Sequence, residues 1–330
     1  MNKVEWGMLV LLSILWGASF LFMKVALLEL PTFTIVFSRV CIASLALLVL
    51  IKVLNNEFPK GIKVWRTFFI MGFINNVVPF SLLVWGMTEI ASGLAAILNA
   101  MTPFFTILVA HFATSDEQIS YNKIVGVLLG LAGVVVLIGV DALGGFNASI
   151  LAMLACLGAA FSYAIAAIYG RQFKRMNLQP VTGAFGQVTA SSLLLLPIVI
   201  IVDSPWTLSM PGMNTWLSIV TLGLGSTAIA YVLYFSILDA AGATNIALVT
   251  LLVPVSAIIF GWLILSETLL TNHLIGMAII TLGLLAIDGR LWVDSRLSAS
   301  MIEGRLPISR PSNARLHRQE SAHCGHTKSM

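Results

Sequence analysis

The chain alternates long apolar runs with short polar gaps. The apolar runs lie near residues 7–28, 33–53, 67–88, 90–113, 122–140, 149–170, 181–202, 216–238, 240–265 and 272–289. A helix needs about 20 residues to cross a hydrocarbon core about 30 Å thick, so each run suits one crossing. A backbone that faces lipid must satisfy its own hydrogen bonds, and the runs lack the alternation of barrel strands. The pattern therefore predicts an all-α integral membrane protein with ten transmembrane helices.

Composition supports this class of protein. Hydrophobic residues make up 58% of the 330 residues and charged residues only 10%, and the mean hydropathy is +0.98. An average soluble domain is far less apolar and carries about 25% charged residues. The basic residues are dispersed in short gaps and in the C-terminal region, without the basic stripe and interleaved aromatic residues typical of nucleic-acid binding. We expect the lipid bilayer and a small molecule as partners, and no nucleic acid.

Cysteine and histidine positions indicate neither a disulfide framework nor a metal site. Cys41 and Cys156 lie in apolar runs and Cys324 lies in the polar tail, at spacings that match no ligand or disulfide pattern. The tail histidines around Cys324 resemble a metal cluster in composition only. No metal and no cofactor are expected.

The distribution of basic residues predicts the orientation. Sixteen of the eighteen Lys and Arg residues fall on one side of the predicted helices, and the gaps on the other side contain none; those gaps are 29–32, around 89, 141–148, 203–215 and 266–271. Loops rich in Lys and Arg stay in the cytoplasm. Both termini are therefore expected in the cytoplasm, and the protein in the cytoplasmic (inner) membrane. The first run is too long for a signal peptide and is expected to remain.

The chain also contains an internal duplication. The matching segments are Leu98–Pro103 with Val249–Pro254, Glu117–Gly126 with Glu267–Gly276, and Trp16–Lys24 with Tyr163–Arg171. We infer two five-helix units, 1–141 and 142–290, followed by a polar cytoplasmic tail, 291–330, that is expected to be disordered. Because five is odd, the second unit enters the membrane from the opposite side. Inverted repeats with proline-interrupted helices at matching positions are typical of transporters.

These features resemble the EamA domain family of the drug/metabolite transporter superfamily, present as two tandem copies. The resemblance covers about residues 5–290 and rests on Trp16-Gly17 with Lys24, Pro31 followed by Arg39, Asn99 through Pro103, and Glu117 and Glu267 before the last helix of each copy. It implies that helices 1–4 and 6–9 surround a central cavity and that helices 5 and 10 are peripheral. Ser266 stands where the family commonly has glycine.

Two basic residues lie inside the predicted helices. An ionised side chain in hydrocarbon costs at least about 2.5 kcal/mol, so Lys24 and Arg39 should face protein, water or the interface. One interpretation is an electrostatic attractor for a carboxylate of the substrate. The alternative is that Lys24 snorkels and that Arg39 forms a structural tie to Glu29 or to helix-end carbonyls.

Polar and aromatic residues in the predicted helices complete the candidate substrate site. The candidates are Trp16, Asn76, Asn99, Tyr163, Gln187, Tyr231, Asn245 and Thr250, with interhelical hydrogen bonding as the alternative role. Asn99 and Thr250 occupy equivalent places, four residues before Pro103 and Pro254. Each proline lacks an N–H and so frees a carbonyl one turn earlier, which makes the two prolines candidate hinges.

Two further features bear on energy coupling and assembly. His111 is the histidine placed well within a predicted helix, and its ordinary pKa suits proton exchange, although a helix-end role at the cytoplasmic interface is the alternative. Gly126, Gly130 and Gly133 form a small-residue face on the fifth helix, which favours close helix packing and also allows a homodimer.

The sequence therefore predicts a secondary transporter that exports small organic metabolites, amino acids or related carboxylates, by alternating access. The alternative is a non-transporting membrane scaffold or sensor. The chain has no Gly-rich phosphate loop ending in Gly-Lys-Ser/Thr, which argues against a primary pump. It also lacks a nucleophile–base pair, an aspartate pair or His-Glu metal spacing at membrane depth, so no catalytic residues and no enzyme activity are expected.

Overall fold

The computed structural model describes residues 3–114, 121–138, 147–241, 246 and 248–288. Asn245, Glu117, the boundary predicted between residues 141 and 142, and the tail 291–330 lie outside the described residues. The predictions made for them stay predictions.

The described residues form helices and no strand. They are α1 (Lys3–Ala26), α2 (Thr32–Val53), α3 (Ile62–Gly72), η1 (Phe73–Val77), α4 (Val78–Glu89), α5 (Ser92–Asn99), α6 (Thr102–Ala113), α7 (Tyr121–Ile138), α8 (Ala148–Tyr169), α9 (Arg171–Arg175), α10 (Pro180–Ile198), η3 (Val199–Asp203), η4 (Pro205–Thr207), α11 (Met213–Gly223), η5 (Leu224–Ile229), α12 (Ala230–Ala241), α14 (Val249–Leu265) and α15 (Thr271–Asp288). The all-α prediction is confirmed for this part of the chain.

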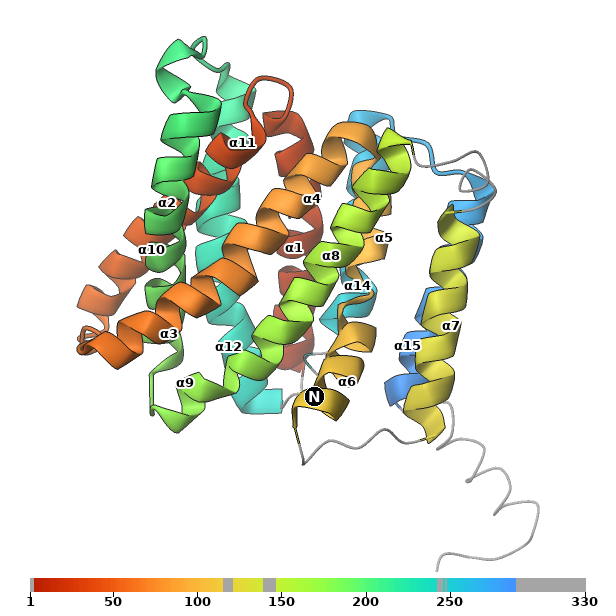
Figure 1. Cartoon of the computed structure of the whole chain (residues 1–330), viewed down its shortest axis with the longest axis horizontal. Helices are drawn as coiled ribbons and strands as arrows, with labels where there is room; N and C mark the ends of the chain where they lie inside the picture. Colours follow the sequence, from red (N-terminus) through yellow and green to blue (C-terminus); the bar gives the residue numbers. More distant parts are fainter. Residues whose placement is uncertain (1–2, 115–120, 139–146, 242–245, 247, 289–330) are drawn as a thin grey trace, which may run out of the picture. The chain divides into compact units, whose positions relative to one another are not determined.

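Joined end to end, these helices give long apolar segments. Within the described residues, eight segments are long and apolar enough to cross a membrane: Lys3–Ala26, Thr32–Val53, Ile62–Glu89, Ser92–Ala113, Tyr121–Ile138, Ala148–Arg175, Pro180–Asp203 and Met213–Leu238. Val249–Leu265 and Thr271–Ile287 are shorter apolar helices, and they coincide with the last two predicted crossings. The first eight crossings predicted from the hydrophobic pattern thus have a helical counterpart of sufficient length, and the last two overlap shorter helices (Figure 1).

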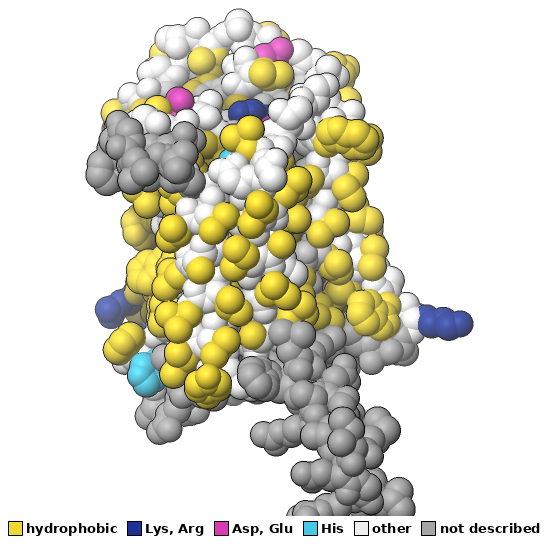
Figure 2. Space-filling view, turned by 90° about the vertical axis from the view of Figure 1, so that its right-hand side faces the viewer, with side chains coloured by type: hydrophobic (Ala, Val, Ile, Leu, Met, Phe, Trp, Pro, Cys, Tyr) yellow, Lys and Arg dark blue, Asp and Glu magenta, His cyan; other side chains and the backbone are white. Residues whose placement is uncertain are grey.

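The surface has the character expected beside lipid. Large apolar side chains such as Val49, Val135 and Ile201 are more than half exposed. Figure 2 shows apolar side chains over the middle of the face that it presents, with charged side chains nearer to its two ends. Exposed apolar patches of this extent are rare in soluble monomers. The chain is a multi-pass membrane protein.

Proline and π-helical turns interrupt the helices near their middles. α5 ends at Asn99 and α6 begins at Thr102, so this crossing is broken close to Pro103, which lies in the first turn of α6. The Thr102 hydroxyl donates to the Asn99 carbonyl at 2.7 Å and replaces the N–H that Pro103 lacks. Pro254, in contrast, lies inside a continuous α14. A hinge role for either proline stays a prediction.

The glycine face of α7 packs against α15. A Cβ on Gly126 would lie 2.7 Å from the Gly283 carbonyl oxygen, and one on Gly133 would lie 2.9 Å from the Gly276 carbonyl oxygen. Only residues without a side chain allow the two backbones to approach this closely. Within the chain, this face is therefore a helix-packing surface. A homodimer through it stays a prediction.

Candidate functional site

A cavity of about 460 Å³ lies among the helices. Its walls come from α1, α2, α8, α9, α10 and α14 and from the three interrupted crossings α3–η1–α4, α5–α6 and η5–α12, whereas α7 and α15 contribute no lining residue. This volume falls within the range of about 300–1,000 Å³ that is usual for small-molecule sites. The division into cavity helices and a peripheral pair is the one that the family resemblance implies.

Arg39 is the one charged side chain among the described residues that line this cavity. Its side chain is 5% exposed, its Nε donates to Thr227 Oγ1 at 2.9 Å, and its guanidinium lies 3.8 Å from the centroid of the Phe80 ring. Its Nη1 lies 3.6 Å from Met23 Sδ. No carboxylate of the described chain forms a salt bridge with it. A buried guanidinium held by neutral groups keeps the capacity to bind an anion.

A π-helical turn in each half supplies polar groups to the cavity. η1 carries Asn75, and η5 carries Ser226 and Thr227. The Thr227 hydroxyl donates to the Leu222 carbonyl five residues earlier at 2.9 Å, which leaves its lone pairs for Arg39. Such turns are frequent at functional sites because they re-aim side chains within a helix. η1 and η5 occupy the third crossing of each predicted repeat.

Amide and hydroxyl groups connect three helical crossings beside the cavity. Asn75 Nδ2 donates to Gln187 Oε1 at 3.1 Å and to Tyr231 Oη at 3.2 Å, and the Tyr231 hydroxyl donates to Asn76 Oδ1 at 3.1 Å. Asn76 is fully buried and donates to Ser191 Oγ at 2.9 Å. Asn75 thus lines the cavity, while Asn76 supports it from behind.

Aromatic rings form much of the remaining wall. The Trp16 and Tyr234 ring centroids lie 5.8 Å apart, and those of Phe80 and Tyr163 lie 6.4 Å apart. Tyr163 and Tyr231 line the same cavity as Arg39. The cavity therefore combines one cation with apolar faces and neutral hydrogen-bonding groups.

Most of the candidates predicted from the sequence meet in this cavity. Those among its lining residues are Trp16, Arg39, Asn99, Tyr163, Gln187, Tyr231, Thr250 and Pro254. Lys24 is not among them, because its Nζ donates to the Met87 and Ile90 carbonyls at the C-terminal end of α4. His111 is also absent from the lining; it is exposed in the last turn of α6, beside Phe112. Proton coupling through His111 stays a prediction.

Sequence reasoning missed the residues that contact Arg39. Phe80 and Thr227 were not among the candidates, although the consecutive polar pair Ser226-Thr227 in an apolar run was a visible signal. The contact between Arg39 and Thr227 joins residues 188 positions apart, which no local pattern reveals.

Charged residues at the predicted outer ends of the helices bind other helix termini. Glu267 accepts from the Ser92 and Gly93 backbone N–H groups at 2.9 and 3.3 Å and from the Ser92 hydroxyl at 2.8 Å. Asp203 accepts from the Thr34 backbone N–H at 2.6 Å. A carboxylate at a helix N-terminus satisfies free N–H groups and complements the helix dipole. These contacts tie the first repeat to the second at this end.

Glu29 makes a similar contact outside the crossings. It accepts from the Gly212 backbone N–H at 2.7 Å at the start of α11. The Thr215 hydroxyl and then the Gly212 N–H lower the pKa of Glu29 from its ordinary value, because both bonds favour the ionised carboxylate. The contact of Glu29 with Gly212 and Thr215 therefore persists at every pH above the ordinary glutamate pKa, and it weakens only as the pH falls through the lowered pKa of Glu29. Glu29 is thus bonded here and not to Arg39.

Replacing Glu267 with glutamine is expected to destabilise the fold by about 1 kcal/mol, the usual loss for a helix N-terminal cap. The amide keeps one acceptor oxygen but loses the charge that bonds Ser92 and Gly93. Thermal unfolding in detergent measures the change. Glu57→Gln, at an exposed residue in the gap after α2, is the control and is expected to unfold like the unmodified protein. Equal unfolding temperatures for the two variants would show that the Glu267 carboxylate does not stabilise the N-terminus of α5.

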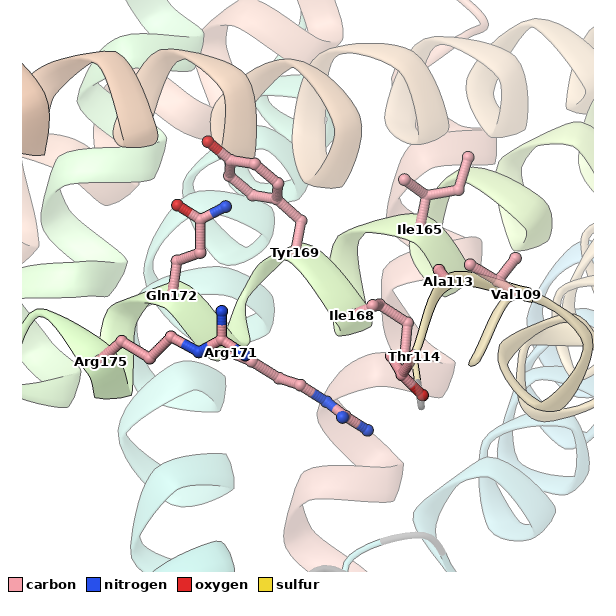
Figure 3. A pocket seen from close by; sticks show the side chains of 9 residues that line it. All are labelled: Val109, Ala113, Thr114, Ile165, Ile168, Tyr169, Arg171, Gln172 and Arg175. Carbon is pink, nitrogen blue, oxygen red and sulfur yellow. The ribbon is translucent and has the colours of Figure 1, made fainter. Parts of the chain in front are cut away.

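A second pocket, of about 580 Å³, lies beside the C-terminal ends of α6 and α8. It is lined by Val109, Ala113, Thr114, Ile165, Ile168, Tyr169, Arg171, Gln172 and Arg175. Figure 3 shows Arg171 extending from α9 toward Thr114 at the end of α6, with Arg175 directed toward Arg171. Its walls come from α6, α8 and α9, and none of the sequence candidates lies in it. The central cavity is therefore the candidate site.

Comparison with known proteins identifies the family. The profile of the EamA-like transporter family matches residues 5–139 and again residues 150–287. The chain belongs to the EamA-like transporter family. The two matches confirm the tandem duplication and correspond to the two helical repeats of this transporter.

Curated relatives align with most of the chain. The chain is 25% identical over 287 residues to the uncharacterised transporter YoaV of Bacillus subtilis (strain 168), and the alignment covers 86% of this chain and 96% of that protein. It is 26% identical over 307 residues to a probable amino-acid metabolite efflux pump of Escherichia coli (strain K12), covering 88% and 97%. A crystal structure of another protein superposes with a TM-score of 0.60 at 20% identity, over 92% of this chain and all of that one, which shows the fold alone.

Proposed function

We propose that this EamA-like transporter is a secondary carrier that moves small organic metabolites, amino acids or related carboxylates, across the cytoplasmic membrane. The proposal includes ten transmembrane helices as two inverted five-helix repeats, with both termini in the cytoplasm. Arg39 is the observation that carries it: a buried cation, without a carboxylate partner in the described chain, lies on the wall of the cavity.

Electrostatics support an anionic group on the substrate. A charge removed from water is costly unless it is paired. Thr227, Met23 and the face of Phe80 solvate the guanidinium in part, but each is electrically neutral. A substrate carboxylate would complete this solvation with charge-assisted hydrogen bonds, which are stronger and shorter than neutral ones. The amides Asn75 and Gln187 would then bind further polar groups, and the aromatic rings would contact an apolar side chain.

The ends of the cavity support alternating access. The lining runs from Arg39 to Gly170, Phe173 and Leu238, near the helix ends that the basic residues assign to the cytoplasm. At the other end, Glu267 and Asp203 bind helix termini of the opposite repeat. We interpret this arrangement as an inward-facing state, in which the outer contacts must break before the cavity opens outward. The relative named as an amino-acid metabolite efflux pump favours export as the physiological direction.

Reconstitution into liposomes tests the proposal. Vesicles that contain the purified protein should take up at least one labelled amino acid or organic acid faster than protein-free vesicles, with and without an imposed pH gradient. Dependence of the initial rate on that gradient would show proton coupling, and independence would show facilitated diffusion or exchange. Absence of flux for the whole panel would contradict a carrier and favour a non-transporting scaffold or sensor.

A further inference from the structure

The cavity contains an unsatisfied acceptor as well as an unpaired cation. Asn99, the last residue of α5, lines the cavity, and its Oδ1 is buried without a hydrogen-bond partner in the described part of the chain. Its own backbone carbonyl is already bonded by the Thr102 hydroxyl. A buried amide oxygen without a donor is unfavourable, and most native structures avoid it. The Asn99 side chain is itself partly exposed, so a turn of its amide would present this oxygen to a donor that arrives in the cavity from outside the protein.

The position of Asn99 adds to its capacity to bind a cation. The C-terminal end of a helix carries a partial negative charge, and α5 ends at Asn99 because the crossing is broken there. In interrupted transporter helices, such ends commonly coordinate cations. A half-turn of the amide exchanges Oδ1 and Nδ2, so the oxygen can face the cavity without a change in the backbone. Trp16 and Tyr234 present aromatic faces on the same cavity, and these also attract cations.

Charge balance favours a substrate of zero net charge. The described lining residues include Arg39 and no aspartate or glutamate, so the wall can neutralise one carboxylate. A second carboxylate would be left without a cation, and an isolated ammonium group would meet Arg39 without a counter-charge. A zwitterion can place its carboxylate on Arg39 and its ammonium group on Asn99 Oδ1.

Resting on the function proposed above, we propose that Asn99 accepts a hydrogen bond from the substrate's ammonium group and thereby selects zwitterionic amino acids over carboxylates that lack the amino group. Asn99 is then a specificity-determining residue. Arg39 provides affinity for the carboxylate that both kinds of substrate share.

Paired substrates test this assignment in proteoliposomes. Each labelled amino acid of a panel is compared with the desamino acid of the same side chain, such as leucine with 4-methylpentanoate. The unmodified protein is expected to transport the best amino acid at least about tenfold more efficiently than its desamino partner, the discrimination expected from one hydrogen bond to a charged group. Equal transport of the two partners would overturn the proposal while leaving the carboxylate carrier intact. Absence of all flux would overturn both.

Variants at Asn99 locate the discrimination. Asn99→Leu keeps the approximate volume and removes the acceptor, so it is expected to lower amino-acid transport about tenfold and to leave the desamino acid unchanged. Asn99→Asp keeps an acceptor and is expected to retain the preference for the amino acid. Asn214→Leu, at an exposed residue of α11, is the matched control and should behave like the unmodified protein. An equal loss for both substrates in Asn99→Leu, or a lost preference in Asn99→Asp, would overturn the role of Asn99.

Discussion

Replacing Arg39 with glutamine is expected to reduce the transport efficiency for carboxylate substrates by at least about thirtyfold. That factor corresponds to about 2 kcal/mol, the lower end of the loss when one partner of a buried charge pair is removed. The reason is that Arg39 is the one cation among the described lining residues, so no other group there replaces it. Initial rates of labelled substrate uptake over a range of concentrations measure the effect.

The Arg39 variant should remain folded. In the unmodified protein the Arg39 guanidinium has no carboxylate partner in the described chain, so Arg39→Gln leaves no buried carboxylate without its counter-charge. Arg39→Lys keeps the charge but not the planar fork that bonds a carboxylate with two N–H groups. Its transport efficiency should therefore lie between that of the unmodified protein and that of Arg39→Gln. Arg66→Gln, at an exposed residue of α3, controls for net charge and should transport normally. Normal carboxylate uptake by folded Arg39→Gln protein would refute the attractor role.

Gly17→Leu is expected to disrupt the fold where α1 packs against α14. A Cβ at residue 17 would overlap Ser256 Oγ and lie 2.9 Å from the Ala257 backbone nitrogen. The hydroxyl can turn away, but the backbone nitrogen cannot, so the two helices must separate. Overpacking of this kind commonly costs about 1–3 kcal/mol, and contact with backbone places Gly17→Leu at the upper end of that range. Thermal unfolding in detergent and the monodisperse fraction on gel filtration measure the loss.

Gly7→Leu is the matched control in the same helix. A Cβ at residue 7 meets no atom within 4 Å, and the residue is exposed. This variant is expected to unfold at the same temperature as the unmodified protein. If both leucine variants were equally stable, close packing of α1 on α14 would be wrong; if both were equally unstable, the loss would not come from contact with α14, and helix propensity could not explain it because leucine favours a helix more than glycine does.

The hydrophobic pattern predicted the helices well because the bilayer imposes a simple requirement of length and apolarity. The duplication led to the cavity for a similar reason: Trp16, Arg39 and Gln187 were chosen as polar or motif residues inside apolar runs, and they do meet. The glycine face of α7 was also visible, since Gly126 and Gly133 repeat at a helical spacing. These features depend on local sequence and on the general cost of burying polar groups.

The remaining features depend on contacts between distant segments. Lys24 and Arg39 were equivalent in the sequence as buried cations, but carbonyls at the end of α4 hold Lys24, whereas neutral groups hold Arg39. Asn75 and Asn76 are adjacent, and which of them faces the cavity depends on the π-helical turn of η1. Composition and periodicity contain no signal for such a turn. The cap that Glu267 places on α5 likewise joins residues 175 positions apart.

Cysteine labelling of two equivalent loops tests the inverted arrangement most directly. Lys60 and Ser209 are exposed residues between the second and third crossings of the first and second repeats, respectively. Single cysteines are introduced there after Cys41, Cys156 and Cys324 are replaced with alanine, and right-side-out membrane vesicles are treated with an impermeant maleimide. Ser209→Cys should react at once and Lys60→Cys only after the membrane is permeabilised. Reaction of both from the same side would contradict two inverted repeats around a shared cavity.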